Sequence, residues 1–219
     1  LSTSIIAAIV ICGIWFVGGL SYKIVGGVLA VAIPSITLSI ILIVTKGKTF
    51  LEPYQYKRVM SWLQPDKFPM DARQQQNSIM AIGSGQLFGK GLNNTGAASV
   101  KSGDYIGEIH TDFIFSIAGE ELGFIGCIII IGLLILITIE CMLIAKKSKE
   151  LTGRLIATGM GTLIVAQSFV NIGVTTGFLP NTGLPLPFVS YGLTSLWSLY
   201  IGIGFVLNIG LQPKKYGRE

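Results

Sequence analysis

The sequence contains little charge. Asp, Glu, Lys and Arg make up 12% of its 219 residues, where soluble globular domains have about 25%. No charged side chain occurs in residues 1–22, 24–45 or 122–139, and none occurs between Arg154 and Lys214. A soluble domain with so few charges could not cover its surface with polar groups. The pattern therefore excludes a soluble fold and indicates a membrane protein.

Histidine and cysteine are also scarce, with one His and three Cys in the chain. Cys12, Cys127 and Cys141 all fall in apolar stretches, and none has the spacing of metal ligands. The cysteines also have no partner cysteine in residues 45–121, so we interpret them as small packing residues. The chain also lacks an initial Met and a signal-peptide n-region. We interpret it as a fragment with further spans upstream.

Long apolar stretches recur along the chain. A bilayer core about 30 Å thick requires roughly 20 apolar residues per helix. The segment before the last stretch contains Pro180, Pro185 and Pro187, so it cannot be a continuous helix. We therefore predict an all-α integral membrane protein, a single polytopic domain over 1–219, with five spans at about 3–20, 24–44, 122–144, 155–175 and 190–208.

The Lys and Arg residues of the short connections predict the orientation. They occur between the first two spans, between the third and fourth, and after the fifth. Short loops rich in Lys and Arg face the cytoplasm, so these three segments and the C-terminus are expected inside the cell. The long 45–121 loop is then extracellular. It contains eight basic and eight acidic residues by direct count, so the net charge of +5 does not indicate a nucleic-acid partner.

Part of the 45–121 loop mixes apolar and polar residues. Residues 74–92, QQQNSIMAIGSGQLFGKGL, are too polar for a span and predict an interfacial or re-entrant helix. Within them, residues 83–91 resemble a phosphate-binding loop, but Gly91 stands where that motif requires Ser or Thr. We interpret this glycine-rich stretch as a turn that allows close packing of the backbone.

Ionisable residues cluster before the third span. Glu108, His110 and Asp112 are followed by Glu120 and Glu121. The last two are equally well interpreted as interfacial charges near a helix N-terminus. His110 could be a second acid/base group or a metal ligand, but a lone His more often makes a structural hydrogen bond. Asp112 is different because Phe113 and other apolar residues follow it directly. An ionisable group at the membrane surface is costly and indicates function.

Two strings point to a known family. EIHTDFIFSIAGEELGFIG fills residues 108–126, and TGLPLPFVSYG fills residues 182–192. Both resemble the signature regions of the SEDS proteins, the FtsW/RodA/SpoVE group. The segments 1–3, 53–65 and 78–92 are similar to further parts of that family in the same register. Departures from the common pattern, such as Ile109 after Glu108 and Thr182 where some members have Lys, leave the subgroup open.

The resemblance implies an activity. Members of the family have ten transmembrane helices, and this chain would be helices six to ten. They polymerise lipid II into glycan strands with a class B penicillin-binding protein during cell elongation, division or sporulation. The acid of the family's His-Thr-Asp-Phe motif, its proposed catalytic residue, matches Asp112, and Arg58 matches the family's arginine.

The implied reaction requires a base for a sugar hydroxyl and groups that stabilise a departing pyrophosphate. Asp112 is the expected base. A divalent ion such as Mg²⁺ or Mn²⁺ would suit the phosphates, although the sequence shows no compact ligand set. Ser190 and Thr194 could bind substrate, but helix capping or interhelical contact is the better explanation for either one taken singly. The substrate-binding candidates are Arg58, Lys57, Arg73, Lys90, Glu108, His110, Ser190 and Thr194.

Two other functions fit a multispanning chain with broken helices. One is a flippase or transporter of lipid-linked precursors, and the other is a non-catalytic scaffold that recruits a penicillin-binding protein. Transporters tend to place coupling charges near the middle of the membrane. Four of the five predicted spans contain no such charge.

Overall fold

The computed structural model is helical in the part of the chain that it describes, which comprises residues 2–19, 21, 23, 26–27, 30, 34–35, 53–92 and 111–212. The chain first forms α1 (Ser2–Val17). The outer segment forms α3 (Pro53–Leu63), a short 3₁₀ helix η1 (Pro65–Lys67) and α4 (Pro69–Ser84). The C-terminal part forms α5 (Ile114–Lys147), α6 (Leu151–Thr175) and α7 (Leu193–Leu211).

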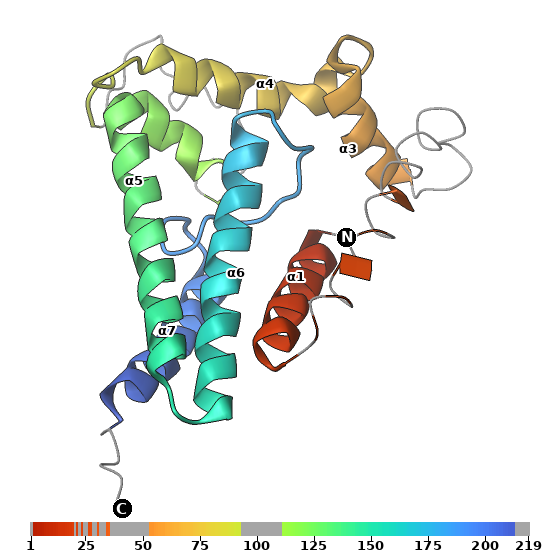
Figure 1. Ribbon diagram of the computed structural model, residues 1–219. Coiled ribbons are helices and arrows are strands. Elements are labelled where there is room, and N and C mark those ends of the chain that lie inside the picture. The colour runs from red at the N-terminus through yellow and green to blue at the C-terminus, as the bar shows by residue number, and fades with distance from the viewer. Residues whose placement is uncertain are drawn as a thin grey trace, which may run out of the picture.

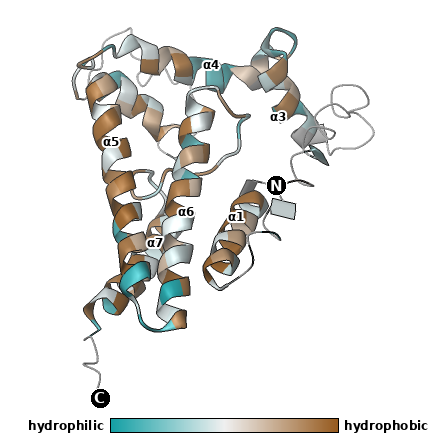
Figure 2. Cartoon of the chain, viewed as in Figure 1, coloured by the Kyte–Doolittle hydropathy of each residue, from teal (hydrophilic) through white to brown (hydrophobic). Residues whose placement is uncertain are grey.

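Three of these helices, α5, α6 and α7, are long and apolar enough to cross a membrane, and the shorter apolar helix Thr3–Val17 lies within α1. Figure 2 shows apolar residues along all four and hydrophilic residues at the lower ends of α5 and α6. The observed helices overlap the predicted spans 3–20, 122–144, 155–175 and 190–208. The predicted span 24–44 lies almost entirely outside the described residues.

Helices α5 and α6 run side by side and pack closely, with α7 against both and α1 against α6 (Figure 1). Their interfaces use small residues. A side chain added at Gly159 of α6 would come within 2.9 Å of Ile14 in α1, so glycine lets these helices approach closely. The main core cluster lies between α5, α6 and α7 and includes Cys141, Ile164 and Val206.

Helix α4 lies across the upper ends of α5 and α6 (Figure 1), and it contacts both of them. The sequence predicted either an interfacial or a re-entrant helix for residues 74–92. The orientation across the bundle is the interfacial one. Helix α3 packs against α4 and extends the same outer layer beyond α6 (Figure 1).

Helix α5 bends sharply at Gly123, where φ is +69° and ψ is −166°. This backbone conformation is accessible to glycine and strained for other residues. The bend separates a short first part, residues 114–122, from the long membrane-crossing part, and the two lie at an acute angle below α4 (Figure 1). The predicted third span begins at residue 122, whereas α5 begins at Ile114. The difference arises because the long apolar stretch starts next to the bend at Gly123, and the residues before the bend form a separate short helical part.

Candidate active site

Asp112 lies in a turn, residues 111–113, directly before α5. Its side chain is partly buried. The next residue, Phe113, is fully buried and packs with Ile117 of α5 and Val174 of α6. The apolar residues after Asp112 therefore anchor the turn in the protein interior, which places the carboxylate at the edge of the core and not in open solvent.

Side chains from α6 and from the segment before α7 hold this turn. The Nδ2 atom of Asn171 donates hydrogen bonds to the carbonyl oxygens of Asp112, at 2.8 Å, and Leu184, at 2.6 Å. The hydroxyl of Ser190 donates to the carbonyl of Thr111 and accepts from the backbone N–H of Leu186 at 2.7 Å. The 111–113 turn and the 184–190 segment are thus fixed to each other.

Arg58 reaches the same segment from α3. Its Nη1 atom donates to the carbonyl oxygen of Asn181 at 3.3 Å. One turn further along α3, the indole N–H of Trp62 donates to the carbonyl of Gly177 at 2.9 Å. These two bonds attach α3 to the loop that follows α6, so the guanidinium is held on the side of the molecule where Asp112 lies.

Gly183 marks the point where Asp112 and Arg58 converge. A Cβ atom placed on Gly183 would lie 3.4 Å from Oδ2 of Asp112 and 3.7 Å from Nη2 of Arg58. Residues 112 and 58 are far apart in sequence, yet both charged groups border the space beside this one glycine. A carboxylate and a guanidinium around the same space can serve as proton acceptor and anion-stabilising group for one bound substrate.

Helix α4 is attached to the end of α6 by buried side chains. The Nε2 atom of Gln75 donates to the carbonyls of Val174, at 2.8 Å, and Leu179, at 2.7 Å. The hydroxyl of Ser78 donates to the carbonyl of Thr175 at 2.9 Å. The carbonyls of Val174 and Thr175 belong to the last turn of α6, and that of Leu179 belongs to the loop after it. The outer layer therefore donates hydrogen bonds to the C-terminal end of α6 and to the loop that follows, where helix carbonyls lack intrahelical partners.

The glycine-rich residues 85–91 form a clasp on the first part of α5. Backbone N–H groups of Lys90 and Gly91 donate to the carbonyls of Glu120 and Glu121, at 2.9 and 3.1 Å. In return, N–H groups of residues 124 and 125 donate to the carbonyls of Gln86 and Leu87. A Cβ on Gly85 would overlap the carbonyl oxygen of Gly119. This stretch makes close backbone contacts. The interpretation of these residues as a packing turn predicted such contacts.

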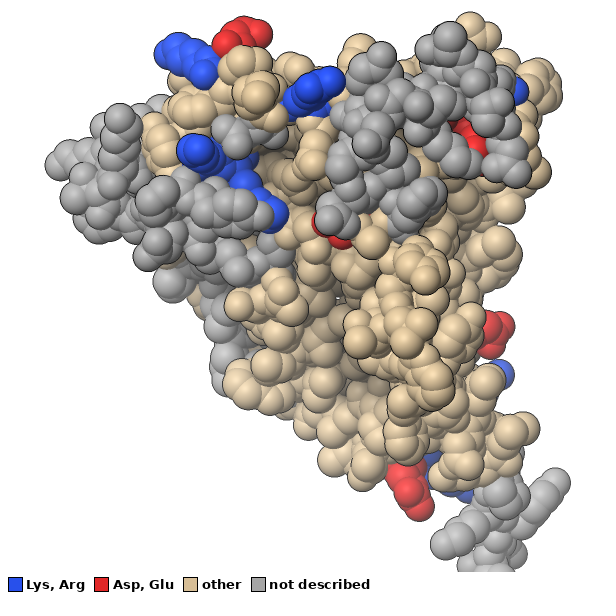
Figure 3. Space-filling view, turned by 180° about the vertical axis from the view of Figure 1, so that it is seen from behind, with Lys and Arg blue, Asp and Glu red and all other residues tan. Residues whose placement is uncertain are grey.

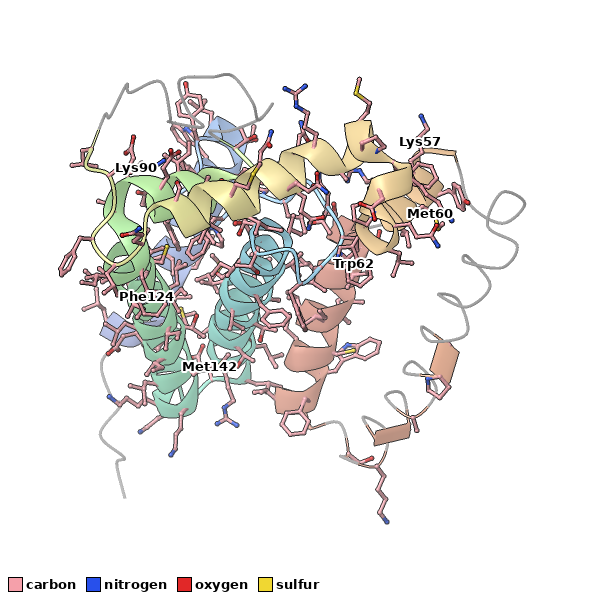
Figure 4. All side chains as sticks on the ribbon, turned by 90° about the horizontal axis from the view of Figure 1, so that it is seen from above. Lys57, Met60, Trp62, Lys90, Phe124 and Met142 are labelled. Carbon is pink, nitrogen blue, oxygen red and sulfur yellow. The ribbon has the colours of Figure 1, made fainter. Side chains whose placement is uncertain are left out.

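Lys90 also forms an ion pair inside this clasp. Its ammonium lies 2.8 Å from Oε1 of Glu120, whose side chain is only 3% exposed. Lys57 and Lys90 lie at opposite ends of the outer layer, one near α3 and the other near the top of α5 (Figure 4). The predicted cations therefore do not gather at one point.

The remaining predicted site residues lie in different surroundings. Lys57, Arg73 and Thr194 are exposed, on α3, α4 and the first turn of α7. Figure 3 shows several basic side chains over the outer end of the molecule, above a broad band with little charge. The hydroxyl of Ser190 makes the structural bonds described above. Glu108 and His110 lie outside the described residues. Within the described part, no three His, Cys, Asp or Glu side chains are grouped as a metal site would require.

Sequence reasoning missed three residues at this site: Asn171, Gly183 and Asn181. Asn171 offered a weak signal, because it and Gln167 are amides four residues apart in an apolar span and so share one helix face. Gly183 and Asn181 offered none, because loop residues become neighbours of Asp112 and Arg58 only in the folded chain.

Comparisons with known proteins show to which family the chain is similar. The family model for FtsW/RodA/SpoVE, described as "Cell cycle protein", matches residues 1–215. A probable peptidoglycan glycosyltransferase FtsW of Buchnera aphidicola is 39% identical over 82% of this chain and 44% of its own length. The peptidoglycan glycosyltransferase MrdB of Escherichia coli K12 is 36% identical over the whole chain and 57% of its own length.

A solved structure is similar as well. It is described as "Structural coordination of polymerization and crosslinking by a peptidoglycan synthase complex" and aligns with a TM-score of 0.68 at 29% identity, over 96% of this chain and 55% of the other. The chain thus spans about half the length of the curated relatives it matches. These matches confirm the predicted resemblance: the chain is a membrane protein that belongs to the FtsW/RodA/SpoVE family.

Proposed function

We propose that this chain is the catalytic half of a peptidoglycan glycosyltransferase that polymerises lipid II into glycan strands. The relatives named above carry that activity in their names. The observation that carries the proposal for this chain is the convergence of the Asp112 carboxylate and the Arg58 guanidinium beside Gly183.

In the proposed reaction, a sugar hydroxyl of one lipid-linked saccharide attacks the anomeric carbon of another. Asp112 accepts the proton of that hydroxyl as the new C–O bond forms. The bond between the anomeric carbon and the pyrophosphate breaks, and its electron pair leaves on the pyrophosphate oxygen. Arg58 stabilises this developing negative charge. Lys57, Arg73 and Lys90 stay predictions as further substrate contacts, as do Ser190, Thr194, Glu108 and His110.

We also propose a class B penicillin-binding protein as the partner, and a cytoplasmic C-terminus. The similarity to a chain of a peptidoglycan synthase complex supports the partner. The Lys and Arg residues of the 146–154 connection support the orientation. No observation in the described part of the chain favours the transporter or the scaffold alternative.

The experiment is a polymerisation assay with purified lipid II and the intact membrane protein. Asp112→Asn keeps the size of the side chain and removes the base, so glycan synthesis should fall by about 10²-fold or more. Asp66→Asn is the matched control, because Asp66 is an exposed acid of the same outer segment, and it should stay within about twofold of the wild type. Full synthesis by Asp112→Asn would exclude Asp112 as the base.

A further inference from the structure

Helix α6 presents two buried amides to the segment before α7. Gln167 and Asn171 are 9% and 1% exposed, and their spacing of four residues puts them on one face. The Nε2 atom of Gln167 donates to the carbonyl of Pro185 at 2.9 Å. Asn171 donates to the adjacent carbonyl of Leu184 and also to that of Asp112. Both amides hold the segment, but of the two only Asn171 reaches the turn of the candidate base.

The environment makes the Asn171 bonds strong and their loss costly. The amide is almost fully buried in a helix that crosses an apolar layer, where an unsatisfied carbonyl has little access to water. The Oδ1 atom of Asn171 is itself buried without a partner among the described residues. Burying an unpaired polar atom is unfavourable, so the two N–H bonds of this side chain must offset a cost that an apolar residue at this position would not have.

The two bonds connect the candidate base to the segment that also holds the candidate cation. Arg58 is attached to this segment through the carbonyl of Asn181, three residues before Leu184. Asn171 attaches the main chain of Asp112 to it at Leu184. The 181–184 segment therefore acts as a common reference that sets the spacing of the carboxylate and the guanidinium.

We infer that Asn171 is a positioning residue: its side-chain amide fixes Asp112 relative to Arg58 and thereby sets the rate of the chemical step. This inference rests on the proposed function. A displacement of about 1 Å in a catalytic group can reduce a rate by about 10²-fold. The shift should leave the binding of the lipid substrate nearly unchanged, because the Asn171 side chain is 1% exposed and its two N–H bonds go to main-chain carbonyls of the protein.

The test compares two variants that each replace a buried amide by an apolar side chain of similar size, Asn171→Leu and Gln167→Met. Steady-state polymerisation should show kcat about 10²-fold lower for Asn171→Leu, with KM for lipid II changed less than about threefold. Gln167→Met should keep kcat within about threefold, because its bond does not involve Asp112. Equal losses in both variants, or a loss confined to KM, would overturn the inference.

A double-mutant cycle separates positioning from general damage. If Asn171 acts through Asp112, adding Asn171→Leu to Asp112→Asn should change the residual rate by less than about twofold. Loss of fold would instead multiply the two effects. Thermal unfolding in detergent checks that each variant folds, and Asn171→Ala, which removes both donors without adding volume, is the second variant if Asn171→Leu does not fold.

Wild-type kcat in a folded Asn171→Leu or Asn171→Ala protein would refute the positioning role. The outcome for the proposed function is read separately. An active Asp112→Asn protein contradicts the proposed base whatever Asn171 does. An inactive Asp112→Asn protein beside a fully active Asn171→Leu protein contradicts only the role of Asn171.

Discussion

Gly183 shows how a single residue shapes the candidate site. Its φ is +70°, a conformation that costs a residue with a side chain about 1–2 kcal/mol. Its open side borders both Asp112 and Arg58, so the absence of a side chain leaves the space that a reacting group would need. A side chain at residue 183 would therefore change both the backbone conformation of the loop and the space beside Asp112 and Arg58.

Gly183→Ala should lower polymerisation by about tenfold or more, because the methyl group enters the space beside Asp112 and strains the loop. The control is Gly91→Ala, where φ is +91° but a Cβ would meet nothing within 4 Å. That variant has the backbone strain without the site contact. Equal activity of the two proteins in the lipid II assay would show that the space beside Gly183 is not used by the substrate.

The ion pair between Lys90 and Glu120 leads to a second prediction at the residue scale, which concerns thermal stability. Lys90→Met removes one partner from a carboxylate that is 3% exposed, and breaking such a buried pair costs about 3 kcal/mol. Thermal unfolding in detergent should therefore show a clear decrease in Tm. Lys67→Met, at an exposed lysine of η1, should change Tm little, and a comparable decrease there would contradict the role of the pair.

At the residue scale, the sequence singled out Asp112 as a candidate and overlooked Asn171. A carboxylate next to an apolar run stands out, because its burial is costly without a reason. An amide inside an apolar span does not stand out, because interhelical packing explains it equally well. The Asn171 amide donates hydrogen bonds to the carbonyls of Asp112 and Leu184. No sequence pattern shows that these two carbonyls lie close together.

At the element scale, the clasp of residues 85–91 joins the outer layer to α5. It binds both sides of the bend at Gly123, through the carbonyls of Glu120 and Glu121 and the N–H groups of Phe124 and Ile125. The short first part of α5 is therefore held between the clasp above it and the Asp112 turn at its start. Packing of two backbones against each other has no periodic signal, which is why the sequence indicated only a close turn here.

Gly85→Ala should weaken this clasp, because the added methyl overlaps the carbonyl of Gly119 and cannot be relieved by a side-chain rotation. We expect a loss of about 2 kcal/mol or more in stability, the order found for overpacked sites. Gly83→Ala, two residues earlier in α4, meets nothing within 4 Å and should be neutral or slightly stabilising in a helix. The comparison uses thermal unfolding of both variants, and equal Tm values would contradict the close contact.

The membrane-crossing helices were the elements that the sequence predicted best. Helix α6, Leu151–Thr175, includes the whole predicted span 155–175, and α7 differs from its predicted span by about one turn. Long apolar runs between charged or proline-rich segments define such helices by length alone. Helices α3 and α4 were harder, because amphipathic outer helices are placed by contacts such as those of Gln75 and Trp62.

At the scale of the whole molecule, the arrangement separates two polar ends by an apolar middle. Helices α3 and α4 cover one end of the bundle, and the connection between α5 and α6 lies at the other (Figure 1). The last turn of α5 and this connection contain Lys146, Lys147 and Lys149, which the rule for short basic loops assigns to the cytoplasm. The outer layer and Asp112 are then expected on the opposite side.

Cysteine labelling in intact cells tests this orientation. In a background with the three native cysteines replaced, Met70→Cys should react with a membrane-impermeant maleimide, since Met70 is 83% exposed on α4. Lys149→Cys, exposed in the α5–α6 connection, should react only after permeabilisation. Labelling of Lys149→Cys in intact cells would reverse the predicted topology.

The loop after α6 has a consequence for biosynthesis. It supplies the carbonyls that bind Arg58 and Trp62, across 123 and 115 residues of sequence. A chain made in order contains α3, the Asp112 turn and α6 before this loop is synthesised. Both charged groups are thus present before the segment that holds Arg58 through Asn181. Asp112 and Arg58 would therefore reach their mutual spacing only after residues 177–184 have been made and have folded against α3.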